Sequence, residues 1–233
     1  MHAPSPTDRS TAARATRRLQ AIDVMRGLVI ALMAVDHSSG EFNAGRVVAD
    51  SAFLFKLGAP LPPGQFFTRW ITHLCAPTFV FLAGTSLAIS IPRRIRSGES
   101  ALGIDRHLLT RGLVIVGFEV VPSYFWMDPG KYLFQVLYAI GTSFLFMIPL
   151  RRLPAWVLVG FAALILCFGE ALTDLAGWGP PDKTPLLAAL LLVPGPHGHV
   201  VIAYPTLYWL AIMLLGYGFG TSIGQGTTPV LLR

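Results

Sequence analysis

The hydrophobic positions of this chain gather into long runs, separated by short segments rich in proline, glycine and arginine. About 20 apolar residues are enough for a helix to cross a lipid bilayer. Six such spans are predicted, roughly at residues 22–36, 70–91, 108–127, 132–150, 155–174 and 200–223. The pattern therefore predicts an all-α fold, a polytopic bundle of about six transmembrane helices.

The composition agrees with a membrane protein. Hydrophobic residues make up 53% of the 233 positions and charged residues only 13%, whereas soluble domains carry roughly 25% charged residues. The formal net charge of +6 lies mostly in short clusters beside the apolar runs. Such clusters are typical of contact with lipid headgroups, so the lipid bilayer is an expected partner and nucleic acid is not.

The basic residues also predict an orientation. Arginines are frequent before the first span, between Arg93 and Arg111, and at Arg151 and Arg152, while the alternate connections carry fewer basic residues. Because cytoplasmic loops hold an excess of Lys and Arg, both chain ends are expected in the cytoplasm. Residues 1–18 lack an apolar core and predict a disordered basic cytoplasmic tail, followed by a membrane domain over residues 19–233.

Two glycine-containing segments lie inside predicted spans, Gly84-Thr85-Ser86 and Gly216-Tyr217-Gly218-Phe219-Gly220. Small residues let helices approach one another closely in lipid. Both segments are therefore predicted to be helix-packing surfaces.

Ionisable residues beside the apolar runs are the main functional candidates, because charge is costly in lipid and is usually paired or functional there. Asp36 and His37 close the first span, and Arg69 and His73 open the second on the same, outer side. Arg69 and His73 are four residues apart and share a helix face. Asp36 is expected to orient a histidine that acts in acid–base or nucleophilic chemistry. Contact of these groups with headgroups or water is the competing interpretation.

Three further charged residues within spans are functional candidates. Asp23 and Arg26 are three residues apart at the inner end of the first span, where they are expected to form an ion pair. Arg26 also suits a cytosolic phosphate, because its planar fork matches phosphate oxygens. Glu119 lies deep in the third span and is expected to pair with a histidine or arginine of a neighbouring helix, or to relay protons. No metal site is predicted, since two histidines around Gly198 do not make one.

Several motifs together suggest a family. Residues 19–28 read Leu-Gln-Ala-Ile-Asp-Val-Met-Arg-Gly-Leu, residues 67–73 read Phe-Thr-Arg-Trp-Ile-Thr-His, and residues 76–84 read Ala-Pro-Thr-Phe-Val-Phe-Leu-Ala-Gly. Weaker matches follow in residues 135–141 and 215–220. With these motifs the chain resembles bacterial membrane proteins related to heparan-alpha-glucosaminide N-acetyltransferase. Members of that family tend to be longer, with further helices, so a carboxyl-terminal truncation of the domain is expected.

The resemblance implies a multi-span acyltransferase in the bacterial cytoplasmic (inner) membrane. Acetyl-CoA would be the co-substrate on the cytosolic side, and an amino sugar or other glycan would accept the acetyl group on the outer side. His37 or His73 would carry or activate the acetyl group, with Asp36 orienting it. Arg69 and Glu119 are the candidates for substrate binding, and Arg26 with Asp23 for binding the CoA phosphates. A homodimer is a further expected partner arrangement.

Two other functions remain open at this point. A proton-coupled small-molecule transporter or permease would use Glu119, His73 and Asp36 as a proton path. It is typically built from internal repeats, and none is visible in the sequence. A catalytically silent membrane scaffold would tolerate the loss of both histidines.

Overall fold

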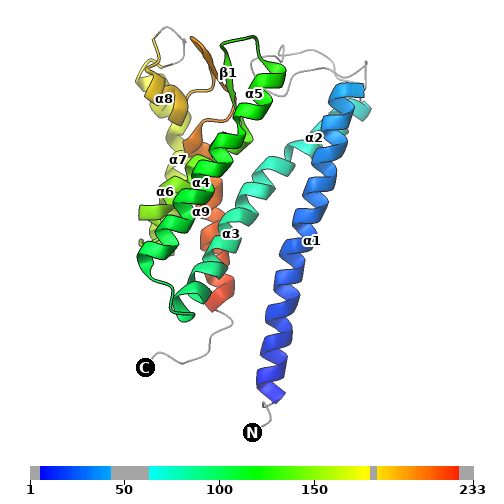
Figure 1. Ribbon diagram of the computed structural model, residues 1–233, viewed down its shortest axis with the longest axis vertical. Helices are drawn as coiled ribbons and strands as arrows, with labels where there is room; N and C mark the ends of the chain where they lie inside the picture. Colours follow the sequence, from blue (N-terminus) through cyan, green and yellow to red (C-terminus); the bar gives the residue numbers. More distant parts are fainter. Residues whose placement is uncertain (1–5, 43–62, 179–182, 226–233) are drawn as a thin grey trace.

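The computed structural model is a helical bundle with one small sheet (Figure 1). It describes residues 6–42, 63–178 and 183–225, without the side chains of residues 6–19 and of a few later positions, Arg69 among them. The elements in chain order are α1 (Pro6–Phe42), α2 (Pro63–His73), α3 (Cys75–Arg96), α4 (Ala101–Phe118), α5 (Val120–Trp126), β1 (Tyr132–Phe134), α6 (Val136–Leu150), α7 (Ala155–Leu175), α8 (Leu186–Leu191), β2 (Gly195–His197), β3 (Val200–Ile202) and α9 (Thr206–Gln225). The all-α prediction is confirmed.

The long helices run alternately up and down, so the first and last helices have their free ends at the same end of the bundle (Figure 1). We call this the basic end, because it also holds the end of α3 with Arg93, Arg94 and Arg96 and the turn after α6 with Arg151 and Arg152. The opposite end carries α2, α5, α8 and the sheet, and we call it the capped end (Figure 1). The basic end is the one that the sequence predicts to be cytoplasmic.

Four of the described helical segments are long and apolar enough to cross a membrane, namely Cys75–Arg96, Ala101–Phe125, Ala155–Leu175 and Thr206–Gly224. The helix α6 is apolar but shorter. Although α1 is 37 residues long, its most apolar stretch carries Asp23, Arg26 and Asp36. The count of six spans therefore stays a prediction. The tail boundary at residue 18 also stays a prediction, and α1 begins before it, at Pro6.

Two predicted spans are interrupted four residues before a proline. The span expected at residues 70–91 is divided between α2, which ends at His73, and α3, which contains Pro77. The span expected at residues 108–127 breaks after Phe118, and Pro122 lies in α5. Proline has no N–H for the carbonyl four residues earlier and its ring clashes with that carbonyl. Both breaks follow from this local chemistry.

The sheet was not expected from the sequence. Its strand order is β1–β3–β2, with β1 parallel to β3 and β2 antiparallel to β3. The spans predicted to begin at residues 132 and 200 therefore begin as strands, and the helices α6 and α9 start only at Val136 and Thr206. Hydropathy does not distinguish a short apolar strand from the first turn of an apolar helix, which explains the error.

The closest packing joins α3 to α9. A Cβ atom at Gly84 would overlap with the Met213 carbonyl oxygen, and one at Gly216 would overlap with the Phe81 carbonyl oxygen. The Thr85 hydroxyl donates a hydrogen bond of 3.0 Å to the Gly216 carbonyl oxygen. The prediction that both glycine segments are packing surfaces is confirmed.

The basic end is held together by one partly buried carboxylate. Asp105 of α4 accepts hydrogen bonds from Arg151 Nε at 2.9 Å and Arg151 Nη2 at 2.6 Å. Its other oxygen accepts from Arg152 Nη2 at 2.6 Å. The Arg151 side chain is only 7% exposed, so the pair links the start of α4 to the turn that precedes α7 in a partly desolvated setting.

Candidate functional site

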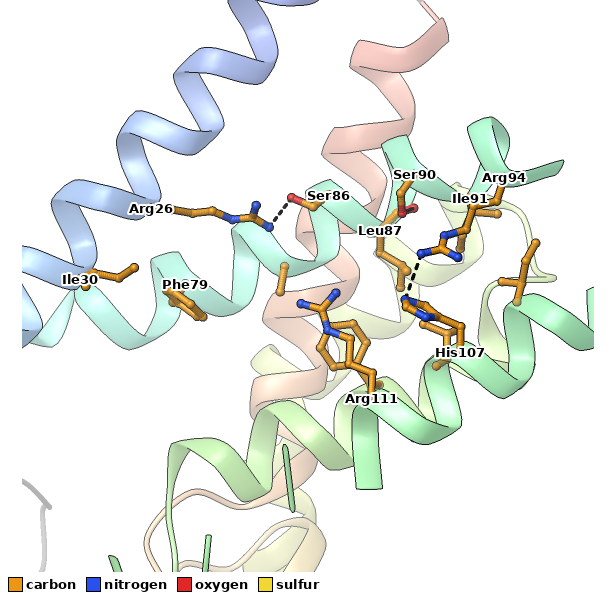
Figure 2. Close-up of a pocket in the computed structure, with 14 residues that line it drawn as sticks. Arg26, Ile30, Phe79, Ser86, Leu87, Ser90, Ile91, Arg94, His107 and Arg111 are labelled. Carbon is orange, nitrogen blue, oxygen red and sulfur yellow. Dashed lines mark hydrogen bonds between the residues drawn. The ribbon is translucent and has the colours of Figure 1, made fainter. Parts of the chain in front are cut away.

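A pocket of about 410 Å³ opens between α1, α3, α4 and α6 (Figure 2). Six of its fourteen lining side chains are polar, and all of the charged ones are cationic. The lining consists of Arg26, Ile30, Phe79, Ala83, Ser86, Leu87, Ser90, Ile91, Arg94, Ile104, His107, Leu108, Arg111 and Phe144. Because the lining contains three arginines and no Asp or Glu, the pocket favours an anionic ligand.

Arg26 enters the pocket from α1 (Figure 2). Its Nη2 atom donates a hydrogen bond of 2.6 Å to the Ser86 hydroxyl of α3, and that hydroxyl donates in turn to the Leu82 carbonyl oxygen at 2.7 Å. Its Nη1 atom lies 3.6 Å from a carboxylate oxygen of Asp23, as the sequence predicts. Asp23 itself lies outside the lining, with a side chain that is 74% exposed. The ion pair therefore leaves the pocket side of Arg26 available to a ligand.

Arg94 and His107 form the edge of the pocket toward the basic end. Arg94 Nη1 lies 3.1 Å from Glu99 Oε2, while Arg94 Nη2 lies 3.2 Å from His107 Nε2 (Figure 2). The Arg94 guanidinium is therefore shared between one carboxylate and one imidazole. Ser90 lines the same edge, and its hydroxyl donates to the Leu87 carbonyl oxygen at 3.1 Å.

Arg111 enters the pocket from α4, one turn after His107 (Figure 2). Its guanidinium carbon lies 4.6 Å from the centre of the Phe144 ring of α6, within the range of a cation–π contact. Among the described residues no carboxylate lies within ion-pair distance of it. In the sequence, Arg111 counts among the basic residues that indicate orientation, and its position in a pocket was not predicted. Its place inside an apolar run was the signal that could have identified it.

The expected histidine site lies toward the capped end. Asp36 and His37 lie on α1, and His73 is the last residue of α2. Asp36 lies within electrostatic range of Cys75 at the start of α3, two residues after His73. Arg69 lies one turn before His73 on α2, with its side chain outside the described part. The joint action of these groups stays a prediction.

The histidine site and the pocket are separate. His37 follows Arg26 by about three turns of α1, which corresponds to about 16 Å along the helix axis. A ligand that uses both sites must therefore be long and must extend along α1.

Glu119 has a local role at the capped end. Its side chain is 2% exposed, and its two oxygens accept hydrogen bonds from the backbone amides of Gln135 at 2.9 Å and Tyr138 at 2.6 Å. A carboxylate at a helix amino terminus satisfies amides that lack intrahelical partners and interacts favourably with the helix dipole. Glu119 thus holds the start of α6 at the break between α4 and α5. Its part in substrate binding stays a prediction.

The described residues contain no group of three or more metal-ligating side chains. His197 lies on β2, and both of its ring nitrogens are buried and unpartnered in the structure. His199 is exposed in the turn between β2 and β3.

The helical fold and the membrane-length helices define a membrane protein with a pocket lined by three arginines. The sequence model of the family described as heparan-alpha-glucosaminide N-acetyltransferase, catalytic, matches residues 18–229. The chain belongs to this family, which makes it a membrane acetyltransferase-like protein. No curated protein and no solved structure matches the chain.

Proposed function

We propose that the protein transfers an acetyl or other acyl group from acyl-CoA on the cytosolic side to an acceptor on the outer side of the bacterial inner membrane. The observation that carries the proposal is the arginine-lined pocket. It lies between the basic end and the histidine site, and α1 contributes residues to both the pocket and the histidine site. An anionic donor and an outward-facing acyl carrier need this relative placement. Membership of the acetyltransferase family agrees with it.

The donor's phosphates bind at the pocket in this proposal. Arg26 provides a planar fork for phosphate oxygens, while Asp23 and the Ser86 hydroxyl fix its direction. The acyl end of the donor then extends along α1, past Ile30, toward Asp36 and His37. This placement requires a donor long enough to span the distance between the two sites.

The histidine site carries out the transfer. An imidazole nitrogen of His37 or His73 attacks the thioester carbon, and the CoA thiolate leaves with the sulfur–carbon bond electrons. The acyl-imidazole then passes its acyl group to an amine or hydroxyl of the acceptor, whose proton is taken up at the site. Asp36 orients the histidine and balances its positive charge, and Arg69 stabilises the oxyanion or holds the acceptor. Glu119 contributes to acceptor binding by holding the start of α6.

The proposed setting is multi-pass insertion with both chain ends in the cytoplasm. The lipid bilayer, an amino sugar or other glycan acceptor and a second copy of the chain are the partners in this setting. A bundle whose first and last helices end together at the basic end supports it (Figure 1).

The test is transfer of label from radiolabelled acetyl-CoA to the purified full chain in detergent. Wild type is compared with His37→Ala and His73→Ala, and with His199→Ala as a control for an exposed histidine at the capped end. We expect wild type and the control to retain label, and one of the two site variants to lose it. That variant identifies the carrier.

Absence of label in wild type, together with absence of CoA binding by calorimetry, would refute the proposal. Proton flux in liposomes would then test the transporter alternative, in which Glu119, His73 and Asp36 form the path. Normal behaviour of both histidine variants in every assay would favour the scaffold.

A further inference from the structure

We propose that Arg111, together with Arg94 and His107, forms a phosphate-binding site in the pocket, with Arg111 as its principal anion ligand. The ligand class is a phosphoryl or pyrophosphoryl group, carried either by a soluble nucleotide-like molecule or by an anionic lipid headgroup. This deepens the proposed function, on which it rests only for the identity of the natural ligand.

Several arginines of the protein have a carboxylate partner, and Arg111 has none among the described residues. Arg26 has Asp23 and Arg94 has Glu99, while Arg151 and Arg152 share a carboxylate. Arg111 has the face of Phe144 and, within the described residues, no carboxylate. The guanidinium lies over the Phe144 ring, which is 2% exposed, and no hydrogen bond to a described residue satisfies its N–H groups. An anion is the missing partner.

Arg111 lies far from the start of α4. It lies ten residues into α4, about 15 Å from the first residue of the helix, in a segment apolar enough to cross a membrane. Arginine near the centre of a membrane helix costs about 2.5–3.5 kcal/mol on insertion scales. Arg111 is exposed, as are Arg93 and Arg96 in the last turn of α3, but it lies in the middle of its helix, where a bound phosphate offsets this cost.

Cationic side chains of two helices meet at the pocket. His107 and Arg111 are one turn apart on α4, and Arg94 approaches them from α3 with Nη2 at 3.2 Å from His107 Nε2 (Figure 2). Two cations of different helices thus face one cavity, with an imidazole that can donate or accept between them. Guanidinium forks pair with phosphate oxygens through two parallel hydrogen bonds. The geometry suits a phosphate better than a single carboxylate, because a phosphate has oxygens for both helices.

The test compares Arg111→Gln with Arg106→Gln, a control arginine that is exposed on the same helix and outside the pocket lining. Full-length protein is placed in phosphatidylcholine nanodiscs, and binding of radiolabelled ADP and CoA is measured by equilibrium dialysis. We expect Arg111→Gln to weaken both probes roughly tenfold to a hundredfold, the range for a lost hydrogen-bonded ion contact. Arg106→Gln should bind like wild type.

A second set of nanodiscs contains phosphatidylglycerol and distinguishes the two sources of phosphate. The site is assigned to a lipid headgroup if two results agree. ADP affinity of wild type is lower in these discs, and native mass spectrometry shows phosphatidylglycerol retained by wild type but not by Arg111→Gln. Unchanged ADP affinity assigns it to a soluble phosphate. Either result supports the site.

Equal ADP and CoA affinity in wild type and Arg111→Gln would overturn the proposal, unless phosphatidylglycerol retention depends on Arg111. The proposal would also be overturned if wild type bound none of the three ligands, ADP, CoA and phosphatidylglycerol. If Arg111→Gln does not fold, Arg111→Lys carries the test: it keeps the charge without the fork, and unchanged affinity refutes the assignment. Arg111-dependent binding without acetyl transfer would leave the site standing and refute only the transferase.

Discussion

A single hydroxyl group, that of Ser86, directs Arg26 in the pocket. Ser86 and Ser90 line the same pocket on the same helix, yet only the Ser86 hydroxyl receives a hydrogen bond from Arg26, at 2.6 Å. The Ser90 hydroxyl bonds only to its own helix. The two serines therefore form a natural pair of test and control.

Replacement of Ser86 by alanine is expected to weaken CoA binding about tenfold. A hydrogen bond to a charged group contributes roughly 1.5–3 kcal/mol, and tenfold in affinity corresponds to about 1.4 kcal/mol. Calorimetry on purified protein measures the effect. Ser90→Ala should leave the affinity unchanged, and equal losses in the two variants would contradict a specific role for Ser86.

At the scale of elements, the helices α3 and α9 approach until backbone meets backbone. Gly84 lies against the Met213 carbonyl group and Gly216 against that of Phe81. The interface has no room for a side-chain carbon at either glycine. In α7, by contrast, Gly160 has nothing within 4 Å of where its Cβ would be.

Gly84→Ala is expected to lower the free energy of unfolding by about 1–3 kcal/mol, because an added methyl group forces the two helices apart. Gly160→Ala should be neutral or should stabilise by up to about 1 kcal/mol, since alanine favours a helix interior. Denaturant unfolding in detergent measures both. A Gly84→Ala protein as stable as wild type would show that the α3–α9 contact is looser than described.

Element boundaries were predictable where local chemistry sets them. The breaks after His73 and Phe118 each precede a proline by four residues, a signal present in the sequence. The pairing of β1 with β3 was not predictable, because it joins residues 68 positions apart, Tyr132 with Val200.

At the scale of the whole molecule, orientation across the membrane is the property to test. Ser97 is exposed in the turn between α3 and α4 at the basic end, and Lys131 is exposed just before β1 at the capped end. Ser97→Cys is expected to resist a membrane-impermeant maleimide in intact cells, and Lys131→Cys is expected to react. Permeabilised cells provide the control, in which both must react. The reverse pattern would contradict a cytoplasmic basic end.

The pocket shows what sequence reasoning lacks at this scale. The Asp23–Arg26 pair was predictable, because residues three apart share a helix face. The contact of Arg26 with Ser86 spans 60 positions, and that of Arg111 with Phe144 depends on how α4 packs against α6. Only the folded bundle brings these groups to one cavity. The arginines are visible in the sequence, but their contacts across helices are not.

The parallel pairing of β1 with β3 sets the relative position of the helices α6 and α9. Each strand leads within a few residues into a helix, β1 into α6 and β3 into α9, and the register Tyr132–Val200 sets how far each helix has advanced when it enters the bundle. A slip of one residue in this register would shift β1 by about 3.3 Å along β3 and turn its side chains to the other face of the sheet. An insertion of one residue between β1 and α6 would turn the face of α6 by about 100° and move it by about 1.5 Å relative to α9, which would misalign the bundle.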